Sequence, residues 1–363
     1  MDFDALNIAA PLVEFAFWLG VAVTAITLVM LAVTLVMRRV ALRRDRIYLE
    51  AVARWRPLIV AEPRAAGAAG AAGADGLPRL SARDRSGFIR VWNEVHESLH
   101  GGTTDNLARI ARETGLEPQL YGALQSRSFH DRVMALIALG HVRSAASFTH
   151  LVTHLHDMSP IMSLCAARAL MQVDPERAAP LLVRRIVERS DWSQGNIAVI
   201  LQEAGGALVS GPLTEATRTA HGELASRLIR LLAGVSPASA APIIRSWLLA
   251  AENEHVVSTC LQVMSNAPDL DCVRPLLAHP RWHVRMLAAA TLGRLGVPGD
   301  EQRLIAMLSD RQWWVRYRAA GGLLHLSFVG PERLRQIQDT QSDTYARDII
   351  THVLAEQAIG GAA

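Results

Sequence analysis

The chain has 363 residues, of which half are hydrophobic and only 5% aromatic, and its formal net charge is +3. Every basic residue is arginine, which excludes the lysine-dependent chemistry of P-loop proteins, kinases and Schiff-base enzymes. Three widely spaced cysteines exclude a CxxC zinc site and a disulfide framework. Abundant alanine with few aromatic residues favours helices over strands.

Residues 15–37, FAFWLGVAVTAITLVMLAVTLVM, contain no charged side chain. About 20 apolar residues are enough for a helix to cross a bilayer, so this segment predicts one transmembrane helix. Residues 1–14 carry acidic but no basic side chains, whereas residues 38–46 carry five arginines and one aspartate. The positive-inside rule then predicts a bacterial inner-membrane protein with a periplasmic N-terminus, residues 1–14, and a cytoplasmic body. The alternative is a buried helix of a soluble protein.

The segment after the predicted anchor has two interpretations. Residues 38–60 are basic and amphipathic, and Tyr48 and Trp55 would lie either at the lipid interface or at the start of the soluble fold. Residues 61–79 are rich in alanine and glycine, which predicts a flexible linker with a reach of about 25 Å. We therefore expect the folded cytoplasmic part to span residues 80–363. Outside residues 38–46 the formal net charge of the chain is −1, and basic residues do not form a stripe. No nucleic-acid partner is therefore expected.

A repeat of about 31 residues runs through that part of the chain. Apolar residues recur at the same offsets from seven reference positions, which lie at residues 131, 162, 193, 224, 256, 284 and 315. Within each segment the apolar residues fall on one helical face, and a second apolar helix precedes most of them, including residues 272–279. A helical hairpin of this kind buries its apolar face only by stacking on its neighbours. The pattern predicts an all-α solenoid of about seven helical hairpins.

The best-formed copies are HPRWHVRMLAAATLGRLG, residues 279–296, and SDRQWWVRYRAAGGLLHLS, residues 309–327. They resemble the HEAT-repeat family, in the short HEAT-like form of phycobilisome lyase-type proteins, over roughly residues 118–340. The resemblance implies a HEAT-like α-solenoid and leaves function open, because such solenoids have many roles. It also implies that Arg285 and Arg316 pair with acidic groups or carbonyls between repeats.

Residues 310–326 place two tryptophans ahead of a run of small residues. One interpretation is structural: residues 319–322, AAGG, allow close helix packing, and the tryptophans cover the start of the helix as Trp282 and Trp192 do elsewhere. The other is a partner-binding surface, because tryptophan and arginine are enriched at interaction hot spots. Its candidate residues are Trp313, Trp314, Arg311 and Arg318.

Catalytic motifs are sparse. His150 and His154 share a helical face at a spacing that a metal ion can use, but a partly exposed amphipathic helix that uses histidine is the favoured interpretation. Deoxyhypusine hydroxylase, a HEAT-like enzyme, uses paired His-Glu motifs, whereas His96-Glu97 is the only such dipeptide here. No catalytic residue, cofactor or metal is therefore predicted. We expect a membrane-tethered scaffold or adaptor with an integral inner-membrane protein partner; the alternative is a HEAT-like lyase or hydroxylase, or a subunit of one.

Overall fold

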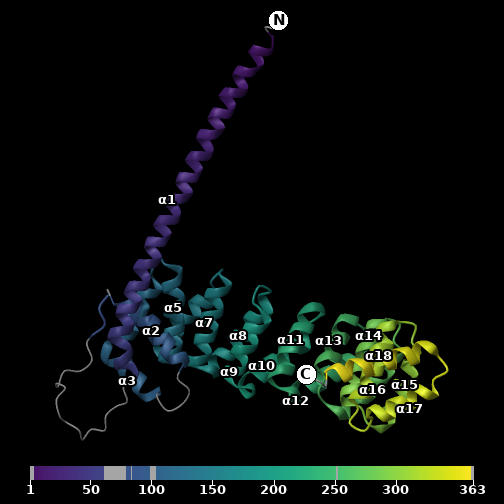
Figure 1. Ribbon diagram of the computed structural model, residues 1–363. Helices are drawn as coiled ribbons and strands as arrows, with labels where there is room; N and C mark the ends of the chain where they lie inside the picture. Colours follow the sequence, from purple (N-terminus) through teal and green to yellow (C-terminus); the bar gives the residue numbers. More distant parts are fainter. Residues whose placement is uncertain (1–3, 61–78, 83, 99–103, 251, 361–363) are drawn as a thin grey trace. The chain divides into compact units, whose positions relative to one another are not determined.

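The computed structural model describes residues 4–60, 79–82, 84–98, 104–250 and 252–360. These residues form helices and turns but no strand, which confirms the all-α prediction. The chain divides into two compact units, unit 1 (Met1–Ser144) and unit 2 (Ala145–Ala363). We describe each unit by itself (Figure 1).

Helix α1 (Asp4–Val60) is a single continuous helix that contains the predicted span and the basic segment after it. By length and composition it is the one helix in the described part of the chain that is long and apolar enough to cross a membrane. The described side chains of residues 15–37 are all exposed. The hydroxyls of Thr24, Thr27 and Thr34 donate to carbonyls four residues earlier, at 2.7–2.8 Å. Their polar groups are therefore satisfied within the helix, as an apolar environment requires.

The last third of α1 packs against the rest of unit 1. The other helices of this unit are α2 (Arg85–Ser98), α3 (Thr104–Thr114), α4 (Leu116–Leu124) and α5 (Phe129–Val142). Trp55 is only 2% exposed, and its ring meets Phe88 of α2 edge-on, with 4.8 Å between centroids. Gly87 allows the two helices to touch, because a Cβ there would lie 2.5 Å from the Cβ of Ala51.

These contacts decide between the two interpretations of the segment after the predicted anchor. Trp55 belongs to the folded part of the chain, which begins before Leu80. Residues 61–78 of the predicted linker lie outside the described residues. Helix α1, which contains the predicted anchor, is in direct contact with α2 of the same unit.

Unit 2 is a row of stacked helical hairpins. Its α-helices are α6 (Phe148–Leu155), α7 (Pro160–Val173), α8 (Pro175–Glu188), α9 (Gln194–Ala204), α10 (Gly206–Thr219), α11 (Gly222–Val235), α12 (Pro237–Ala250), α13 (Glu254–Val263), α14 (Trp282–Leu295), α15 (Glu301–Met307), α16 (Trp313–His325), α17 (Pro331–Thr340) and α18 (Thr344–Gly360). Short 3₁₀ helices complete it: η1 (Ala145–Ser147), η2 (Ala267–Cys272), η3 (Arg274–Ala278) and η4 (Pro298–Asp300).

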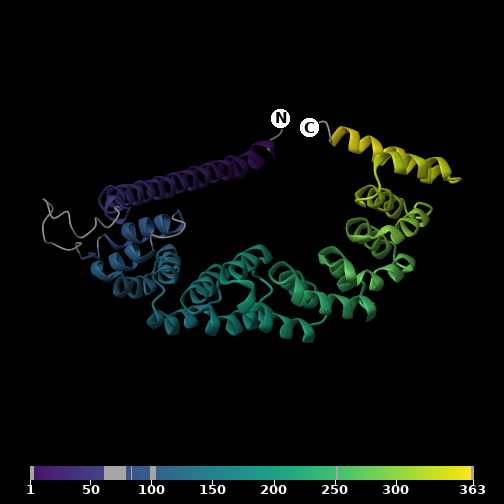
Figure 2. The ribbon, with the colours of Figure 1, turned by 90° about the horizontal axis from the view of Figure 1, so that it is seen from below.

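The contacts between these helices define a HEAT-like solenoid. The first helices of successive hairpins, α7, α9, α11, α13, α14, α16 and finally α18, each contact the next, and α8, α10 and α12 form a second row (Figure 2). The seven reference positions lie in, or at the N-cap of, α5, α7, α9, α11, α13, α14 and α16. The predicted repeat is therefore the structural repeat.

One predicted helix is absent. Residues 272–279 were expected to be helical, but residues 267–278 form the 3₁₀ helices η2 and η3 instead. Pro268 and Pro275 lack the N–H groups that an α-helix would use. This repeat is also the shortest, with 28 residues between its reference positions, so less chain is available for a second α-helix.

The small residues of the last repeats bring α14 and α16 into backbone contact. A Cβ on Gly293 would lie 2.3 Å from the Cα of Gly322. Ala319 and Ala320 are completely buried beside this crossing. Gly321 differs, because a Cβ there would meet nothing within 4 Å. Close packing therefore explains Gly322 and the two alanines, but not Gly321.

Arginine guanidinium groups connect consecutive turns of the solenoid. Arg285 donates to both carboxylate oxygens of Asp310 at 2.7 and 3.0 Å, and to the carbonyl of His279 at 2.9 Å. Arg316 donates to the carbonyl of Asp310 at 2.8 Å. The pairing between repeats that the HEAT resemblance implies is thus present for Arg285, whereas Arg316 contacts the turn before its own helix. Burial opposes ionisation of Asp310, but hydrogen bonds from Arg285 and from the backbone N–H of Gln312 outweigh it and hold the pKa of that carboxyl below its ordinary value.

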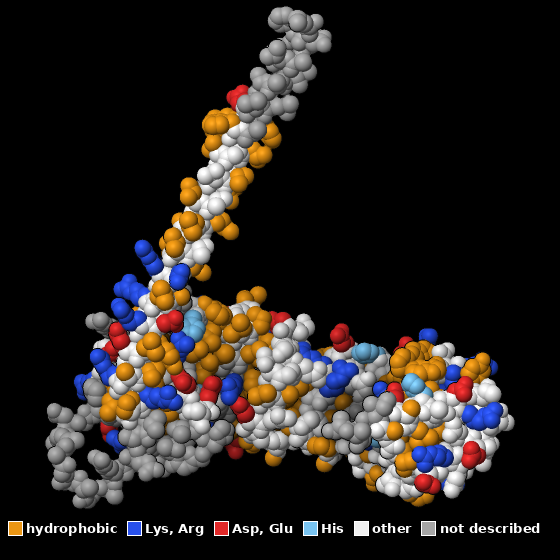
Figure 3. Space-filling view, in the orientation of Figure 1, with side chains coloured by type: hydrophobic (Ala, Val, Ile, Leu, Met, Phe, Trp, Pro, Cys, Tyr) orange, Lys and Arg blue, Asp and Glu red, His pale blue; other side chains and the backbone are white. Residues whose placement is uncertain are grey.

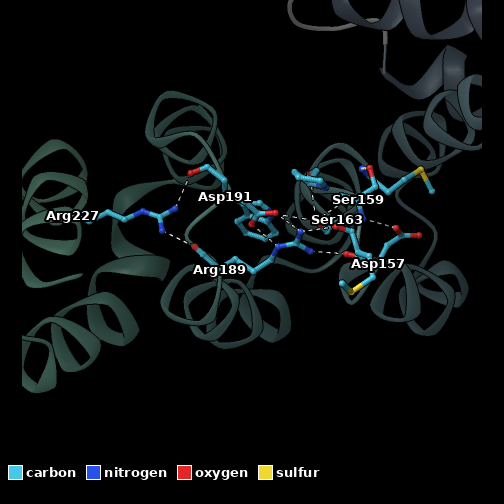
Figure 4. A network of polar contacts seen from close by, with 10 residues as sticks. Asp157, Ser159, Ser163, Arg189, Asp191 and Arg227 are labelled. Atoms are coloured by element: carbon cyan, nitrogen blue, oxygen red, sulfur yellow. Dashed lines mark hydrogen bonds and ion pairs between the residues drawn. The ribbon is translucent and has the colours of Figure 1, made fainter. Parts of the chain in front are cut away.

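A second network links three earlier hairpins (Figure 4). Arg189 donates to the carbonyl of Asp157 at 2.6 Å and to the carboxylate of Asp191 at 2.6 and 2.8 Å. Arg227 of α11 donates to the carbonyls of Arg189 and Trp192 at 2.6 and 2.9 Å. Arginine suits these positions because its planar fork satisfies several acceptors together.

The α14–α16 crossing can be tested with two glycines. We expect Gly293→Ala to lower the free energy of unfolding by about 1–3 kcal/mol, because its methyl group would meet backbone that cannot rotate away. Gly321→Ala makes the same chemical change on open helix surface and should be neutral or stabilising by up to about 1 kcal/mol. Denaturant unfolding of the full-length protein in detergent, followed by circular dichroism, measures both. Equal destabilisation by the two variants would contradict the crossing.

The Arg285–Asp310 pair should give stability a defined pH dependence. We expect Asp310→Asn to cost about 2–3 kcal/mol at neutral pH, because it removes the charged partner of a largely buried guanidinium. A carboxyl whose folded pKa is lowered contributes stability above its unfolded value near 3.8 and loses it as pH falls through the folded value. The difference in the free energy of unfolding between Asp310→Asn and the wild-type protein should therefore be constant above about pH 5 and should become smaller below about pH 4. Asp339→Asn, at an exposed position, is the control and should show no such trend.

Candidate functional site: an aromatic edge on the C-terminal repeats

The first helices of the C-terminal repeats begin with exposed aromatic side chains. Trp282 starts α14, Trp313 and Trp314 start α16, and Tyr345 is the second residue of α18. Their exposed fractions are 40%, 42%, 52% and 67%. They therefore occupy equivalent places on three helices that contact one another in sequence. We call these four residues the aromatic edge; hydrophobic side chains gather over the C-terminal helices in Figure 3.

The rings at the start of α16 are held in place. Trp313 stacks on Tyr317 with 5.1 Å between centroids and a 10° interplanar angle, and Trp314 lies edge-on to Trp313 at 4.7 Å. His352 of α18 approaches Trp313 at 6.3 Å. The Tyr317 hydroxyl donates to Glu356 of α18 at 2.8 Å, and this hydrogen bond raises the pKa of Tyr317. The cluster is therefore preorganised although it is exposed.

Arginine side chains lie beside the rings. The guanidinium carbon of Arg316 lies 5.5 Å from the centre of the Tyr345 ring, and that of Arg318 lies 6.0 Å from the centre of the Tyr317 ring. Arg311 is exposed in the turn before α16. Arg318 combines cation–π attraction with an exposed guanidinium, whereas the guanidinium of Arg316 already donates to the carbonyl of Asp310. The edge therefore offers aromatic area and charge-assisted hydrogen bonds together.

A groove of about 470 Å³ adjoins the edge on α14, α16 and α18. Arg294, Arg318, His325 and Glu356 supply its polar groups, and Gly321 forms part of its wall. Arg294 is committed to the preceding repeat, because its guanidinium donates to the carbonyls of Leu261 and Met264.

The structure brings only part of the predicted partner surface together. Trp313 and Trp314 lie in one cluster, whereas Arg318 lines the groove and Arg311 lies in the preceding turn. Sequence reasoning missed Tyr317, Tyr345 and His352. The last two lie on α18, which follows the recognisable repeats, so no repeat signal marked them.

The tryptophans of the repeats do not share one role. The sequence pattern predicts that Trp192, like Trp282 and Trp313, covers the start of a helix. It is only 2% exposed, and its indole N–H donates to the hydroxyl of Ser163 at 3.0 Å. Trp192 is therefore a core residue, whereas Trp282 and Trp313 keep about two fifths of their surface exposed.

The histidine and cysteine candidates lie elsewhere. His150 and His154 lie on α6, and among the described residues no group of three His, Cys, Asp or Glu side chains could hold a metal ion. His96 stacks on His141 with 4.4 Å between centroids, and burial, together with the charge of Arg143, lowers the pKa of His96. Burial, reinforced by the neighbouring Cys272, raises the pKa of Cys260 to about 12, so that thiol stays protonated.

Comparisons with known proteins identify no family. No family model and no curated protein matches the chain. Among solved structures, an engineered protein matches with 16% identity and a TM-score of 0.33, covering 75% of this chain and 85% of its own. Kap121p matches with 11% identity and a TM-score of 0.46, covering 75% of this chain and 36% of its own.

A complex of CpcE and CpcF of phycocyanin lyase from Nostoc sp. also matches. The identity is 16% and the TM-score 0.26, and the match covers 77% of this chain and 97% of that one. These similarities are too low to indicate a function. The fold assignment rests on the stacked hairpins themselves.

Proposed function

We propose that this protein is a membrane-tethered, non-catalytic scaffold that binds another protein through the aromatic edge. The observation that carries the proposal is the exposure of Trp282, Trp313, Trp314 and Tyr345 at equivalent positions of successive helices. Tryptophan, tyrosine and arginine dominate the residues that contribute most to protein–protein binding. Because the rings at the start of α16 are already ordered, little side-chain entropy would be lost on binding.

The anchor is the second part of the proposal. The exposed apolar surface of α1 and its internally satisfied threonines support a transmembrane role. The arginines that follow support a periplasmic N-terminus and a cytoplasmic body in a bacterial inner membrane. Because the same helix continues into the packed part of unit 1, the membrane would orient unit 1 directly.

The proposed partner is an integral inner-membrane protein, such as a glycosyltransferase or transporter of the envelope machinery. Confinement of both molecules to one membrane raises their effective concentration, which favours binding through a modest surface. The alternative, a HEAT-like lyase or hydroxylase or a subunit of one, has no arrangement of the described residues in its favour.

Topology can be tested with fusions after Ala363. Alkaline phosphatase requires an oxidising compartment for its disulfides, so a fusion at this position should be inactive in cells. A green fluorescent protein fusion at the same position should fluoresce and reports that the fusion is made. High phosphatase activity with no fluorescence would place the body outside the cytoplasm and exclude the proposed scaffold.

The binding surface can be tested by crosslinking the full-length protein in intact cells. Trp313→Ala combined with Trp314→Ala should reduce recovery of crosslinked multi-pass proteins at least about 10-fold, since hot-spot truncations cost 2 kcal/mol or more. Leu249→Ala removes a side chain of α12 that is 68% exposed and should leave recovery unchanged. Mass spectrometry quantifies both. Unchanged recovery with the double variant would exclude the aromatic edge as the interface.

A further inference from the structure

Unit 1 contains a cavity of about 190 Å³ where α1 meets α2, α4 and α5. Ile47 and Tyr48 line it from α1, Arg85 and Arg90 from α2, and His130 and Asp131 from α5. In Figure 3, basic, acidic and histidine side chains gather where α1 joins the other helices of this unit. The aromatic edge does not include any of these residues.

The cavity has an excess of positive charge. No ion pair joins Arg85 or Arg90 to a carboxylate in the described part of the chain. Arg90 instead lies over the Tyr48 ring at 3.9 Å, while the Tyr48 hydroxyl donates to Glu94. Asp131 is the one acidic residue of the lining, and its carboxylate accepts a hydrogen bond from Ser126 at 3.3 Å. Two arginines and one carboxylate therefore line the cavity, together with His130.

The neutral residues of the lining could contact the part of a larger ligand that lies next to its anionic group. The hydroxyls of Ser86 and Ser128 add hydrogen-bonding groups, and Ile47, Ile89 and Met134 form an apolar wall. The volume is below the roughly 300–1,000 Å³ of sites that enclose a whole drug-sized ligand. It fits one small anionic group whose remainder lies outside the cavity.

The position of the cavity on α1 suggests where that remainder lies. Ile47 follows the end of the apolar segment at Met37 by ten residues, which is about 15 Å along a helix. The polar layer of a bilayer accounts for roughly 5–8 Å of that distance on each side. A lipid that stays in the bilayer could therefore reach the cavity only with a headgroup that extends beyond the phosphate next to its glycerol.

We propose that this cavity binds the terminal phosphate of a phosphorylated headgroup, with Arg85 and Arg90 as its ligands. Arginine forks match phosphate oxygens in paired, charge-assisted hydrogen bonds, and two arginines suit the charge of about −2 and the three terminal oxygens of a phosphate monoester better than a singly charged carboxylate or a neutral sugar. The same chemistry would accept a soluble phosphate ester. The lipid source rests on the membrane anchoring proposed above, whereas the phosphate chemistry does not.

The test uses the full-length protein in nanodiscs of phosphatidylcholine, with and without phosphatidylinositol phosphate. Native mass spectrometry should detect retained phosphatidylinositol phosphate on the wild-type protein. Arg85→Gln combined with Arg90→Gln should weaken its retention at least 10-fold. Arg46→Gln combined with Arg56→Gln removes the same charge from exposed positions outside the cavity and should change retention less than twofold. Ser86→Phe fills the cavity without removing charge and should also abolish retention.

The outcomes separate the ligand sources and the competing explanations. Free inositol phosphate that binds as tightly as the lipid would identify a soluble ester as the source and would leave the cavity assignment intact. Equal losses in the two double arginine variants would show diffuse attraction to an anionic membrane and would overturn the proposal. Absence of retention by the wild-type protein, with normal circular dichroism, would also overturn it. None of these results depends on crosslinking at the aromatic edge, so the two proposals can fail independently.

Discussion

The stacking of one helical hairpin on the next is the interaction on which the rest of unit 2 depends. A single hairpin leaves an apolar face uncovered, and only its neighbours in the row can bury that face. Residues such as Val284, Leu292, Val315 and Leu323 are completely buried because each repeat supplies the covering surface of the next. The stacking also places the starts of successive helices side by side. The exposed aromatic residues at the starts of α14, α16 and α18 therefore lie along one edge of the unit.

Two kinds of contact hold the repeats at their spacing. Glycine at the α14–α16 crossing removes the side-chain volume that would keep the helices apart. Arginine provides the polar counterpart, since Arg285, Arg189 and Arg227 satisfy carbonyls of turns that would otherwise lack partners. A chain without lysine is well suited to this arrangement, because an ammonium group cannot match several fixed acceptors in one plane.

Unit 1 follows a different constraint, because its long exposed apolar segment and part of its core belong to one helix, α1. Trp55, Phe88 and Trp92 form its aromatic centre, with Trp55 supplied by α1. The apolar part of α1 is therefore continuous with the helical segment that packs into this core and lines the cavity beside it. For the proposed tethered scaffold, this makes the membrane anchor a structural part of the protein.

The sequence by itself determined the helical class, the repeat spacing and the apolar segment, because each depends on local periodicity and composition. It also predicted the inter-repeat pairing of Arg285 through the HEAT resemblance. Tertiary structure alone decided which tryptophans are exposed, since Trp192 and Trp282 have similar places in the repeat but different neighbours. It likewise decided that Trp55 belongs to a core, that residues 267–278 turn as 3₁₀ helices, and that α18 completes the aromatic edge. These features depend on what a distant segment places against each side chain, and neither spacing nor composition records that contact.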